Sequence, residues 1–303
     1  MSLQKEPLVS IILPSYKMGS YVSRALESIG KQTYTNWEVL LVDDCGPEDG
    51  THNAVLEFQS NYPANRVQYI RNSENFGIGN SRNIAIAESR GEFLAFLDPD
   101  DFWGDNYLWE AVNGIGDSDL CFQGARIVDE NGTDHGIRME RRMDDLIARF
   151  PESLFSENFL LPSCTILHRR VIKQVGVFLG RPELMYATDW DFYLRCIRQK
   201  QRFVFLKSNE CCYRKHSGAA TNNYTQMLRD CVKLLRINYK TSDGWMKKLL
   251  KKSLHDHLCR LTYLKISFRD WSGLKEAGEA FLINPCNSYL PKSLIKALRN
   301  NWS

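Results

Sequence analysis

The stretch VLLVDDCGPEDG, residues 39–50, places four apolar residues directly before two adjacent carboxylates, Asp43 and Asp44. An unbroken run of Val and Leu is typical of a strand that is buried on both faces of a sheet. Small and turn-forming residues follow at once, so the predicted strand ends at the two acids. The stretch therefore predicts a pair of charged groups at the carboxyl edge of a buried sheet.

The first hundred residues repeat this unit, in which an apolar run is followed by a turn and a helical pattern. Val22, Leu26 and Ile29 recur at the spacing of a helix that buries one face. Strands that alternate with helices predict an α/β fold with a mostly parallel central sheet flanked by helices, and such sheets bind ligands at the carboxyl ends of their strands. The strands of this sheet are predicted at residues 8–16, 37–44, 67–72 and 92–101.

The alternation of strands and helices loosens after residue 118. The stretch HGIRMERRMDDLIARFPES, residues 135–153, is charged and poorly periodic, and it is predicted to be a mobile loop over the carboxyl edge of the sheet. The pattern is helical from residue 221 onward. We therefore expect residues 1–220 to form one domain and residues 221–303 to form a C-terminal helical extension.

Charge and cysteine content separate these two parts further. The whole chain carries a net charge of +3, but residues 229–303 hold 15 Lys and Arg against 6 Asp and Glu, a net charge of +9. A basic surface of this kind attracts phosphate groups. Nine cysteines without C-x-x-C spacing indicate reduced thiols, and the sequence has no run of 18 apolar residues, so the expected location is the cytoplasm.

The sequence DPDD sets three carboxylates within four residues at the end of the fourth predicted strand: Asp98, Asp100 and Asp101. Acids this close repel one another when ionised, so either one of them holds a proton or a cation lies among them. Carboxylate oxygens suit Mg²⁺ or Mn²⁺. The alternative is a turn whose acids only cap the helix that follows.

Three segments together resemble family 2 glycosyltransferases of the GT-A fold. They are VSIILPSYKMGSYVSRALESIGKQTYTNWEVLLVDDCGPEDGT, then RNSENFGIGNSRNIAI, then FLDPDD, and the likeness extends from residue 8 to about residue 218. The resemblance implies a Rossmann-like GT-A catalytic domain over residues 1–220. In this family the first half of the domain, here residues 1–101, binds the nucleotide, and the second half, here residues 102–220, binds the acceptor.

The resemblance also implies which residues bind the donor. Pro14 and Tyr16 match the family's P-x-Y at the end of the first strand, where the ring lies against the nucleoside base. Asp44 matches the acid that contacts uracil, whereas Asp43 is expected to fix the loop. Arg82 lies where the family places an arginine near the nucleotide-sugar, and Asp98 matches the D-x-D acid that faces the ribose.

The implied metal ligands are Asp100, the second acid of the D-x-D motif, and His216. The segment YRKHSGAAT resembles the family's Y-R-x-H segment, in which the histidine can complete a site for Mn²⁺ or Mg²⁺. Imidazole binds Mn²⁺ acceptably beside carboxylate oxygens. A lone histidine is more often a hydrogen-bonded or surface residue, so a role without metal remains the alternative.

The catalytic base implied by the family is Asp189, in YATDWDFYLRC. The family motif usually has two adjacent acids here, and Thr188 replaces the first of them. A positioned carboxylate can take the proton of an acceptor hydroxyl as it attacks the anomeric carbon. Asp191 is the competing candidate, and an N-cap for the helix that follows is the structural alternative for Asp189.

These observations predict an inverting, metal-assisted enzyme of the hexosyltransferase type. It would move a sugar from a nucleotide donor, most simply a UDP-sugar, to a hydroxyl of a saccharide or lipid-linked saccharide, as in the synthesis of cell-surface polysaccharides. The run VLLVDD also suits a receiver-type signalling module, although a whole strand and helix precede it here. A catalytically inactive sugar-nucleotide-binding protein is the other alternative.

The basic tail contains the amphipathic segment WMKKLLKKSLHDHLCRLTYLKISF, residues 245–268. Its leucines recur on one helical side and most of its lysines on another. The first interpretation is an ordinary amphipathic helix packed on the catalytic domain. The second is peripheral contact with an anionic membrane surface, where lipid-linked acceptors reside. No nucleic-acid partner is expected.

Overall fold

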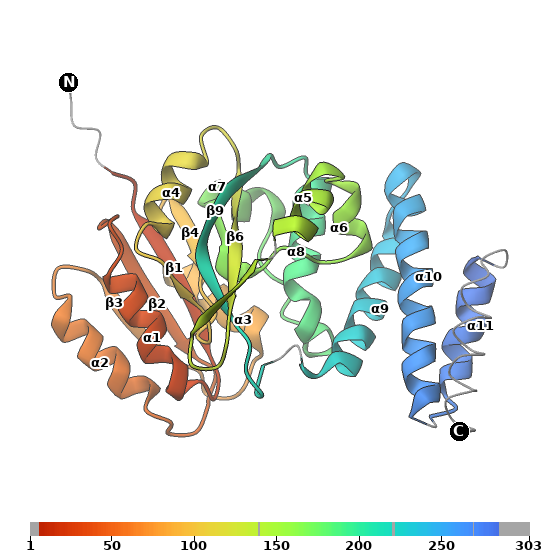
Figure 1. The fold of residues 1–303 in the computed structure, drawn as a ribbon, viewed down its shortest axis with the longest axis horizontal. Helices are drawn as coiled ribbons and strands as arrows, with labels where there is room; N and C mark the ends of the chain where they lie inside the picture. The colour runs from red at the N-terminus through yellow and green to blue at the C-terminus, as the bar shows by residue number, and fades with distance from the viewer. Residues whose placement is uncertain (1–5, 139, 220–221, 269, 285–303) are drawn as a thin grey trace. The chain divides into compact units, whose positions relative to one another are not determined.

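A computed structural model of the chain describes residues 6–138, 140–219, 222–268 and 270–284. The chain forms two compact units (Figure 1). Met1–Ala148 and Phe159–Ser217 make up the first, which we call the sheet unit. Arg149–Asn158 and Gly218–Ser303 make up the second, which we call the helical unit. A ten-residue segment from the middle of the chain thus belongs with the C-terminal helices.

The first half of the sheet unit is the predicted parallel sheet. The central strand β1 (Val9–Ser15) pairs in parallel with β2 (Trp37–Asp43) on one side and with β4 (Phe93–Phe96) on the other, and β2 pairs in parallel with β3 (Val67–Arg71). Every residue of β1 and β2 is buried, as their apolar runs predict.

Helices cover both faces of this parallel sheet (Figure 1). Val22, Leu26 and Ile29 of α1 (Gly19–Gly30) are buried against one face, together with side chains of α2 (Thr51–Asn61). The residues of α1 and α2 form one hydrophobic cluster with the sheet. The helix α3 (Ile78–Glu88) also contacts β1 and β2, but its residues lie outside this cluster. The three-to-four-residue spacing of the apolar side chains therefore places α1 where the sequence predicts it.

Within the part of the chain that the structure describes, the second half of the sheet unit extends the sheet with four antiparallel strand pairs and one parallel pair. Among the described residues, the strand order is β3-β2-β1-β4-β8-β6-β9-β5, with β7 paired to β6. The added strands are β5 (Phe102–Trp103), β6 (Leu120–Val128), β7 (Asp134–Arg138), β8 (Thr165–His168) and β9 (Phe203–Arg214). The further helices of this unit are α4 (Tyr107–Gly114), α5 (Glu140–Ala148), α7 (Arg169–Val175) and α8 (Thr188–Arg198), with the short 3₁₀ helices η1 (Pro162–Cys164) and η2 (Pro182–Ala187).

The prediction of a mobile loop at residues 135–153 is wrong. This stretch contains most of β7, all of α5 and the start of α6 (Glu152–Ser156). Gly132, with a φ of +79°, turns the chain between β6 and β7, so that Asp134–Arg138 pairs back on β6 as a hairpin. The many charged residues of the stretch hide this pairing from a search for apolar periodicity.

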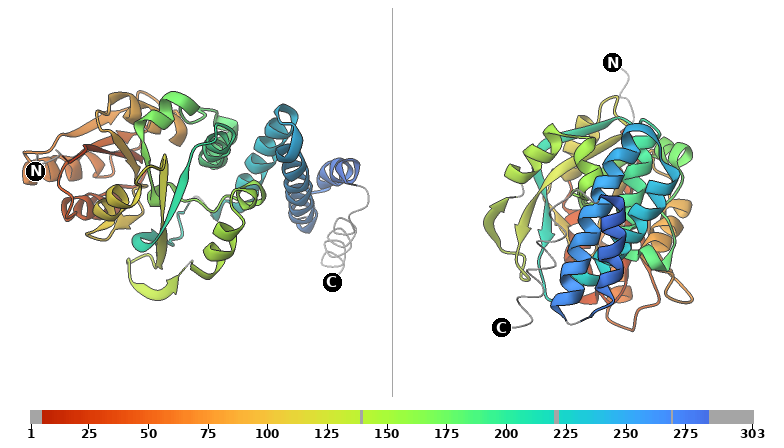
Figure 2. Two further views of the ribbon diagram at one scale, coloured as in Figure 1. Left: turned by 90° about the horizontal axis from the view of Figure 1, so that it is seen from above. Right: turned by 90° about the vertical axis from the view of Figure 1, so that its right-hand side faces the viewer.

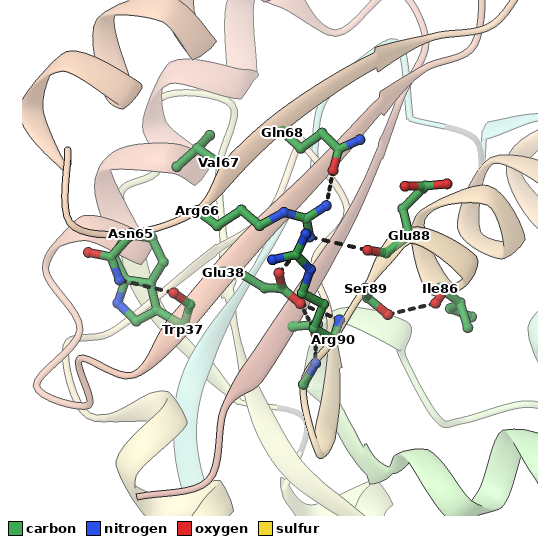
Figure 3. Close-up of polar contacts among 12 residues, drawn as sticks. Trp37, Glu38, Asn65, Arg66, Val67, Gln68, Ile86, Glu88, Ser89 and Arg90 are labelled. Atoms are coloured by element: carbon green, nitrogen blue, oxygen red, sulfur yellow. Dashed lines mark hydrogen bonds and ion pairs between the residues drawn. The ribbon is translucent and has the colours of Figure 1, made fainter.

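A buried carboxylate fixes the amino-terminal edge of the sheet, at the opposite end of the strands from the acids (Figure 3). Glu38 of β2 accepts hydrogen bonds from Ser10 Oγ at 2.6 Å and from Arg66 Nη1 at 2.6 Å. The backbone N–H of Arg90 also donates to it, at 2.5 Å, and Ser10 Oγ in turn accepts from Gly91 N–H at 2.7 Å. One side chain thus joins β1 and β2 to the turn that leads into β4.

In its described residues, the helical unit contains α6 and three longer helices that lie side by side (Figure 2): α9 (Tyr224–Thr241), α10 (Gly244–Ser267) and α11 (Gly273–Ile283). Leu154 and Phe155 of α6 are buried, and the Phe155 ring contacts the Trp245 ring of α10. The α10 leucines 250, 254, 258 and 261 are buried as well. The leucine side of α10 therefore packs inside the helical unit, whereas the first interpretation of residues 245–268 expects it to pack on the catalytic domain.

Two further observations concern the described part of the chain. No helix within it is both long enough and apolar enough to cross a membrane. Its cysteines are free thiols, which agrees with the reduced state expected from their number and spacing.

Candidate active site

The carboxyl ends of β1, β2 and β4 meet at one edge of the sheet unit. Pro14 is a buried residue of β1, and Tyr16, just beyond the strand, is 39 % exposed. Asp44 N–H donates to Ser15 O at 2.8 Å, so the end of β1 lies against the end of β2. The three residues that are predicted to bind the nucleotide-sugar therefore lie next to one another at this edge: Pro14, Tyr16 and Asp44.

Asp43 holds the loop that follows β2. Its carboxylate accepts hydrogen bonds from Tyr69 Oη at 2.7 Å and from Gly46 N–H at 2.9 Å, and it also pairs with Arg71. Arg71 donates a further hydrogen bond to Gly46 O at 2.6 Å. All of these partners belong to the loop or to β3, which agrees with the expectation that Asp43 fixes the loop.

Asp44 is buried and orders the segment between β3 and α3. It accepts hydrogen bonds from Asn72 Nδ2 at 2.7 Å and from the N–H groups of Phe76 and Gly77 at 2.8 and 2.7 Å. Gly77 has a φ of +84°, a conformation that favours glycine and turns its N–H toward Asp44. Since a carboxylate offers about four acceptor positions, one remains for a ligand N–H.

Arg82 of α3 is a buried cation between two carboxylates. Its Nη2 donates to Asp98 Oδ1 at 2.7 Å, and its guanidinium carbon lies 5.5 Å from the centre of the Phe178 ring. Burial lowers the pKa of Arg82, but the nearby charges of Asp98 and Asp189 raise it, and the net shift is upward. Among the described residues, the buried Arg82 Nε has no hydrogen-bond partner.

Two asparagines of α3 bring the segment before α8 to Arg82. Asn83 donates to Phe178 O at 2.8 Å and accepts from Phe178 N–H at 2.9 Å, while Asn80 Nδ2 donates to Gly180 O at 3.1 Å. A Cβ atom on Gly79 would lie 2.6 Å from Leu179 O, so only glycine allows this approach. The sequence interpretation missed these contacts, although Asn80 and Asn83 share one helix face in NSRN.

The geometry separates the two candidates for the base. Asp189 is partly exposed in the first turn of α8, and its Oδ1 accepts from Trp190 N–H at 2.8 Å. The N-cap position belongs to Ala187, so the N-cap alternative for Asp189 is wrong. Asp191 is buried and accepts from Arg195 Nε at 2.7 Å. Of the two acids, Asp189 is the one that solvent and a substrate can reach.

The DPDD turn, residues 98–101, and the end of β9 form the second half of this edge of the sheet. His216 Nε2 lies 3.1 Å from Asp100 Oδ2, and the two side chains are about 2 % and 20 % exposed. Burial and the charge of Asp98 raise the pKa of Asp100, while His216 opposes that rise. Arg214 fixes the turn from below, because its N–H donates to Asp101 Oδ1 at 3.0 Å and its Nε to Asp100 O at 2.8 Å.

The pair Asp100 and His216 suits a divalent cation. Two ligand atoms that are each about 2.1 Å from an octahedral ion, at adjacent positions, are about 3.0 Å apart, close to the observed 3.1 Å. The described residues contain no group of three or more His, Cys, Asp or Glu side chains arranged to hold a metal. A cation here would therefore need oxygen ligands from a substrate or from water, as Mg²⁺ commonly does beside phosphates.

Acids, an arginine and an aromatic ring lie together at the strand ends of a mostly parallel sheet, an arrangement typical of α/β proteins that bind a ligand at this edge. The sequence profile of Glycosyl transferase family 2 matches residues 10–176, which is more than half of the chain. The chain belongs to this family. Membership confirms the predicted glycosyltransferase class and removes the receiver-module alternative.

Three known proteins illustrate the likeness. An uncharacterized glycosyltransferase of Haemophilus influenzae is 43 % identical over 252 residues, 77 % of each chain. The UDP-Glc:alpha-D-GlcNAc-diphosphoundecaprenol beta-1,3-glucosyltransferase WfgD of Escherichia coli is 43 % identical over 115 residues, 38 % of this chain and 44 % of WfgD. The mannosyltransferase PcManGT of Pyrobaculum calidifontis, solved with GDP-Man and Mn²⁺, has a TM-score of 0.67 at 16 % identity over 99 % of this chain and 88 % of its own. The last likeness confirms the GT-A fold.

Proposed function

We propose that this chain is an inverting glycosyltransferase that moves a sugar from a UDP-sugar to a hydroxyl of a saccharide or lipid-linked saccharide. The observation that carries the proposal is the meeting of Asp98, Arg82 and Asp189, which come from three separate elements. A turn that would bind the sugar donor and an accessible candidate for the catalytic base thus lie at the same edge of the sheet. The name of WfgD, which specifies a UDP-linked donor and a diphosphoundecaprenol-linked acceptor, supports the choice of substrates.

The donor would lie along the ends of β1, β2 and β4. The exposed ring of Tyr16, two residues after Pro14, offers a flat apolar surface for the nucleoside base. Asp44 keeps one acceptor position for an N–H group of that nucleoside base. Asp98 would accept from a ribose hydroxyl. The free Nε of Arg82 would donate to an oxygen of the nucleotide-sugar.

Asp100 and His216 would hold a Mn²⁺ or Mg²⁺ ion, as their separation and donor atoms allow. When bound, a divalent cation neutralises the charge of a leaving diphosphate as a Lewis acid. Arg214 contributes by holding the Asp100 carbonyl, which sets the direction of the turn toward His216. In this proposal residues 1–101 bind the donor, residues 102–220 bind the acceptor, and residues 221–303 form a basic extension.

Asp189 would take the proton from the acceptor hydroxyl. A base that receives this proton on the face opposite the departing diphosphate leads to single displacement with inversion at the anomeric carbon. The contacts of Asn83 and Asn80 with the segment before α8 hold this carboxylate near Arg82. Asp191 is the weaker candidate, because one of its carboxylate oxygens accepts a hydrogen bond from Arg195 Nε.

The test is Asp189→Asn, with Asp117→Asn as a matched change of an exposed carboxylate at the amino-terminal edge. We expect Asp189→Asn to retain UDP binding in thermal-shift assays with Mn²⁺ and to lose transfer by about 100-fold or more. Asp117→Asn should match the wild type in both assays. Near-normal transfer by Asp189→Asn would place the base elsewhere.

A panel of nucleotides and nucleotide-sugars, with and without Mn²⁺, tests donor binding separately. UDP and a UDP-sugar should raise the melting temperature of the wild type. Stabilisation by UDP without transfer to any acceptor would favour the inactive binding protein instead. The proposal fails if no nucleoside diphosphate stabilises the protein in either condition.

A further inference from the structure

One face of α11 is apolar and exposed in the part of the chain that the structure describes. Leu274, Phe281 and Leu282 are exposed, Leu282 to 82 %, and their spacing with Gly278 places them on one side of the helix. A Cβ atom on Gly278 would meet nothing within 4 Å. Trp271, also exposed, precedes this face by one turn. Ala277 and Ala280 of α11 are buried, so the helix already packs through another side.

A cationic groove of about 470 Å³ adjoins this face within the helical unit. Its charged lining consists of Arg236 and Lys240 of α9, Lys251 of α10 and Glu279 of α11, a net charge of +2. Arg236 Nε donates to Glu279 Oε1 at 2.8 Å, which joins α9 to α11. Within the described part of the chain, Lys240 and Lys251 are exposed and form no ion pair.

The apolar face and the groove are continuous. Leu282 belongs to the face and also lines the groove, beside Tyr239. A further cation, Lys247, lies with its Nζ 5.3 Å from the centre of the Tyr239 ring. In the described part of the helical unit, apolar side chains and lysines that form no ion pair therefore lie next to each other on one surface. A helix that lies in a membrane interface presents this combination.

We propose that this surface docks the protein on an anionic phospholipid bilayer. Phe281 and Leu282 would enter the boundary between head groups and acyl chains, and Lys240 and Lys251 would contact lipid phosphates. The membrane contact that the second interpretation gives to residues 245–268 thus moves to α11, because four leucines of α10 are buried: Leu250, Leu254, Leu258 and Leu261. The proposal does not depend on the transfer reaction.

Charge complementarity selects a bilayer over a second copy of the chain. The charged lining of the groove has a net charge of +2, so two copies of this surface would bring like charges together. An anionic bilayer instead supplies both the opposite charge and an apolar layer. Lys275, exposed on α11 between Trp271 and Leu282, adds to the attraction.

The experiment is flotation of the full-length protein with vesicles of phosphatidylcholine alone and of phosphatidylcholine mixed with phosphatidylglycerol. We expect binding only to the anionic vesicles, and much less binding at high salt. Lys240→Glu with Lys251→Glu should weaken binding about 20-fold or more, since each lysine near such a surface contributes about fivefold. Phe281→Ser with Leu282→Ser should weaken it at least tenfold at unchanged charge.

Matched changes on the sheet unit are the controls. Lys31→Glu with Lys207→Glu reverses two exposed lysines, and Leu56→Ser removes an exposed leucine. These variants should float with anionic vesicles about as the wild type does, and all variants should keep the wild-type melting temperature within a few degrees. Equal flotation of wild type and α11 variants would overturn the proposal. So would a dimer in solution that Phe281→Ser with Leu282→Ser converts to monomer.

Discussion

At the scale of the residue, Arg82 connects the parts of the candidate site. It is the buried cation that Asp98 binds directly and Asp189 faces, and it retains one donor without a partner in the described structure. The sequence predicts an arginine near the donor at this position through family resemblance. It does not predict that the same guanidinium also lies next to the candidate base, because this depends on contacts about a hundred residues apart.

Replacement of Arg82 by Met tests that position. The change leaves Asp98 without its ion-pair partner, so we expect the free energy of unfolding to fall by about 2–3 kcal/mol. This loss is smaller than for a fully buried ion pair, because the Asp98 side chain is partly exposed. Transfer should fall about 100-fold or more. Urea denaturation and transfer assays measure the two effects.

Arg82→Lys is the matched control for this change, because it keeps the charge and loses the planar fork. It should recover most of the stability and only part of the activity. A fully active Arg82→Met variant would show that the guanidinium has no part in donor binding or in positioning Asp189.

At the scale of the element, the strand ends are what the sequence predicts best. Asp44, Asp98 and Asp100 follow buried apolar runs, and parallel strands bring such ends together. The sequence predicts β7 and α5 poorly, because charged residues there obscure the periodicity. It also gives no sign of which long-range partners hold a loop, such as Asn72 for Asp44 or Asn83 for the segment before α8.

Glu38 allows a test of the amino-terminal edge of the sheet through pH. Burial raises its pKa, but hydrogen bonds from Ser10, from the Arg90 N–H and from Arg66 outweigh burial, so the folded pKa lies below the ordinary 4.5. A carboxyl group with a lowered folded pKa stabilises the protein above the unfolded pKa. That stabilisation is lost as the pH falls through the folded value.

We therefore expect Glu38→Gln to lower the free energy of unfolding by about 1–3 kcal/mol near neutral pH. The variant should lose less stability than the wild type when the pH is lowered below 4.5. Urea denaturation across this range measures both effects. Glu57→Gln, at an exposed carboxylate of α2, is the control. Identical acid sensitivity in Glu38→Gln and the wild type would contradict the assignment.

At the scale of the whole molecule, the two units come from an interleaved chain. The sequence indicates a helical C-terminal part through its pattern and its charge. It does not reveal that Arg149–Asn158 belongs with those helices, because α6 is short and lies inside a charged stretch. Only the packing of α6 on α10 shows where these residues belong.

A chain that ends after Ser217 tests this interleaving. It would lack α9, α10 and α11, so Leu154 and Phe155 would lose their cover, at a cost of about 1.5–3 kcal/mol for each side chain. We expect self-association in size-exclusion chromatography. The same truncation with Leu154→Ser and Phe155→Ser should be monomeric. A monomeric truncated chain without these changes would show that α6 needs no partner from the C-terminal helices.

The position of α6 also has a consequence for synthesis on the ribosome. Leu154 and Phe155 leave the exit tunnel about a hundred residues before the leucines of α10, which at about 5–20 residues per second corresponds to roughly 5–20 seconds. During this interval the nascent chain can complete most of its sheet, whereas α6 remains an apolar segment without its partner. The growing polypeptide thus exposes an apolar segment that is covered only after α10 has left the tunnel.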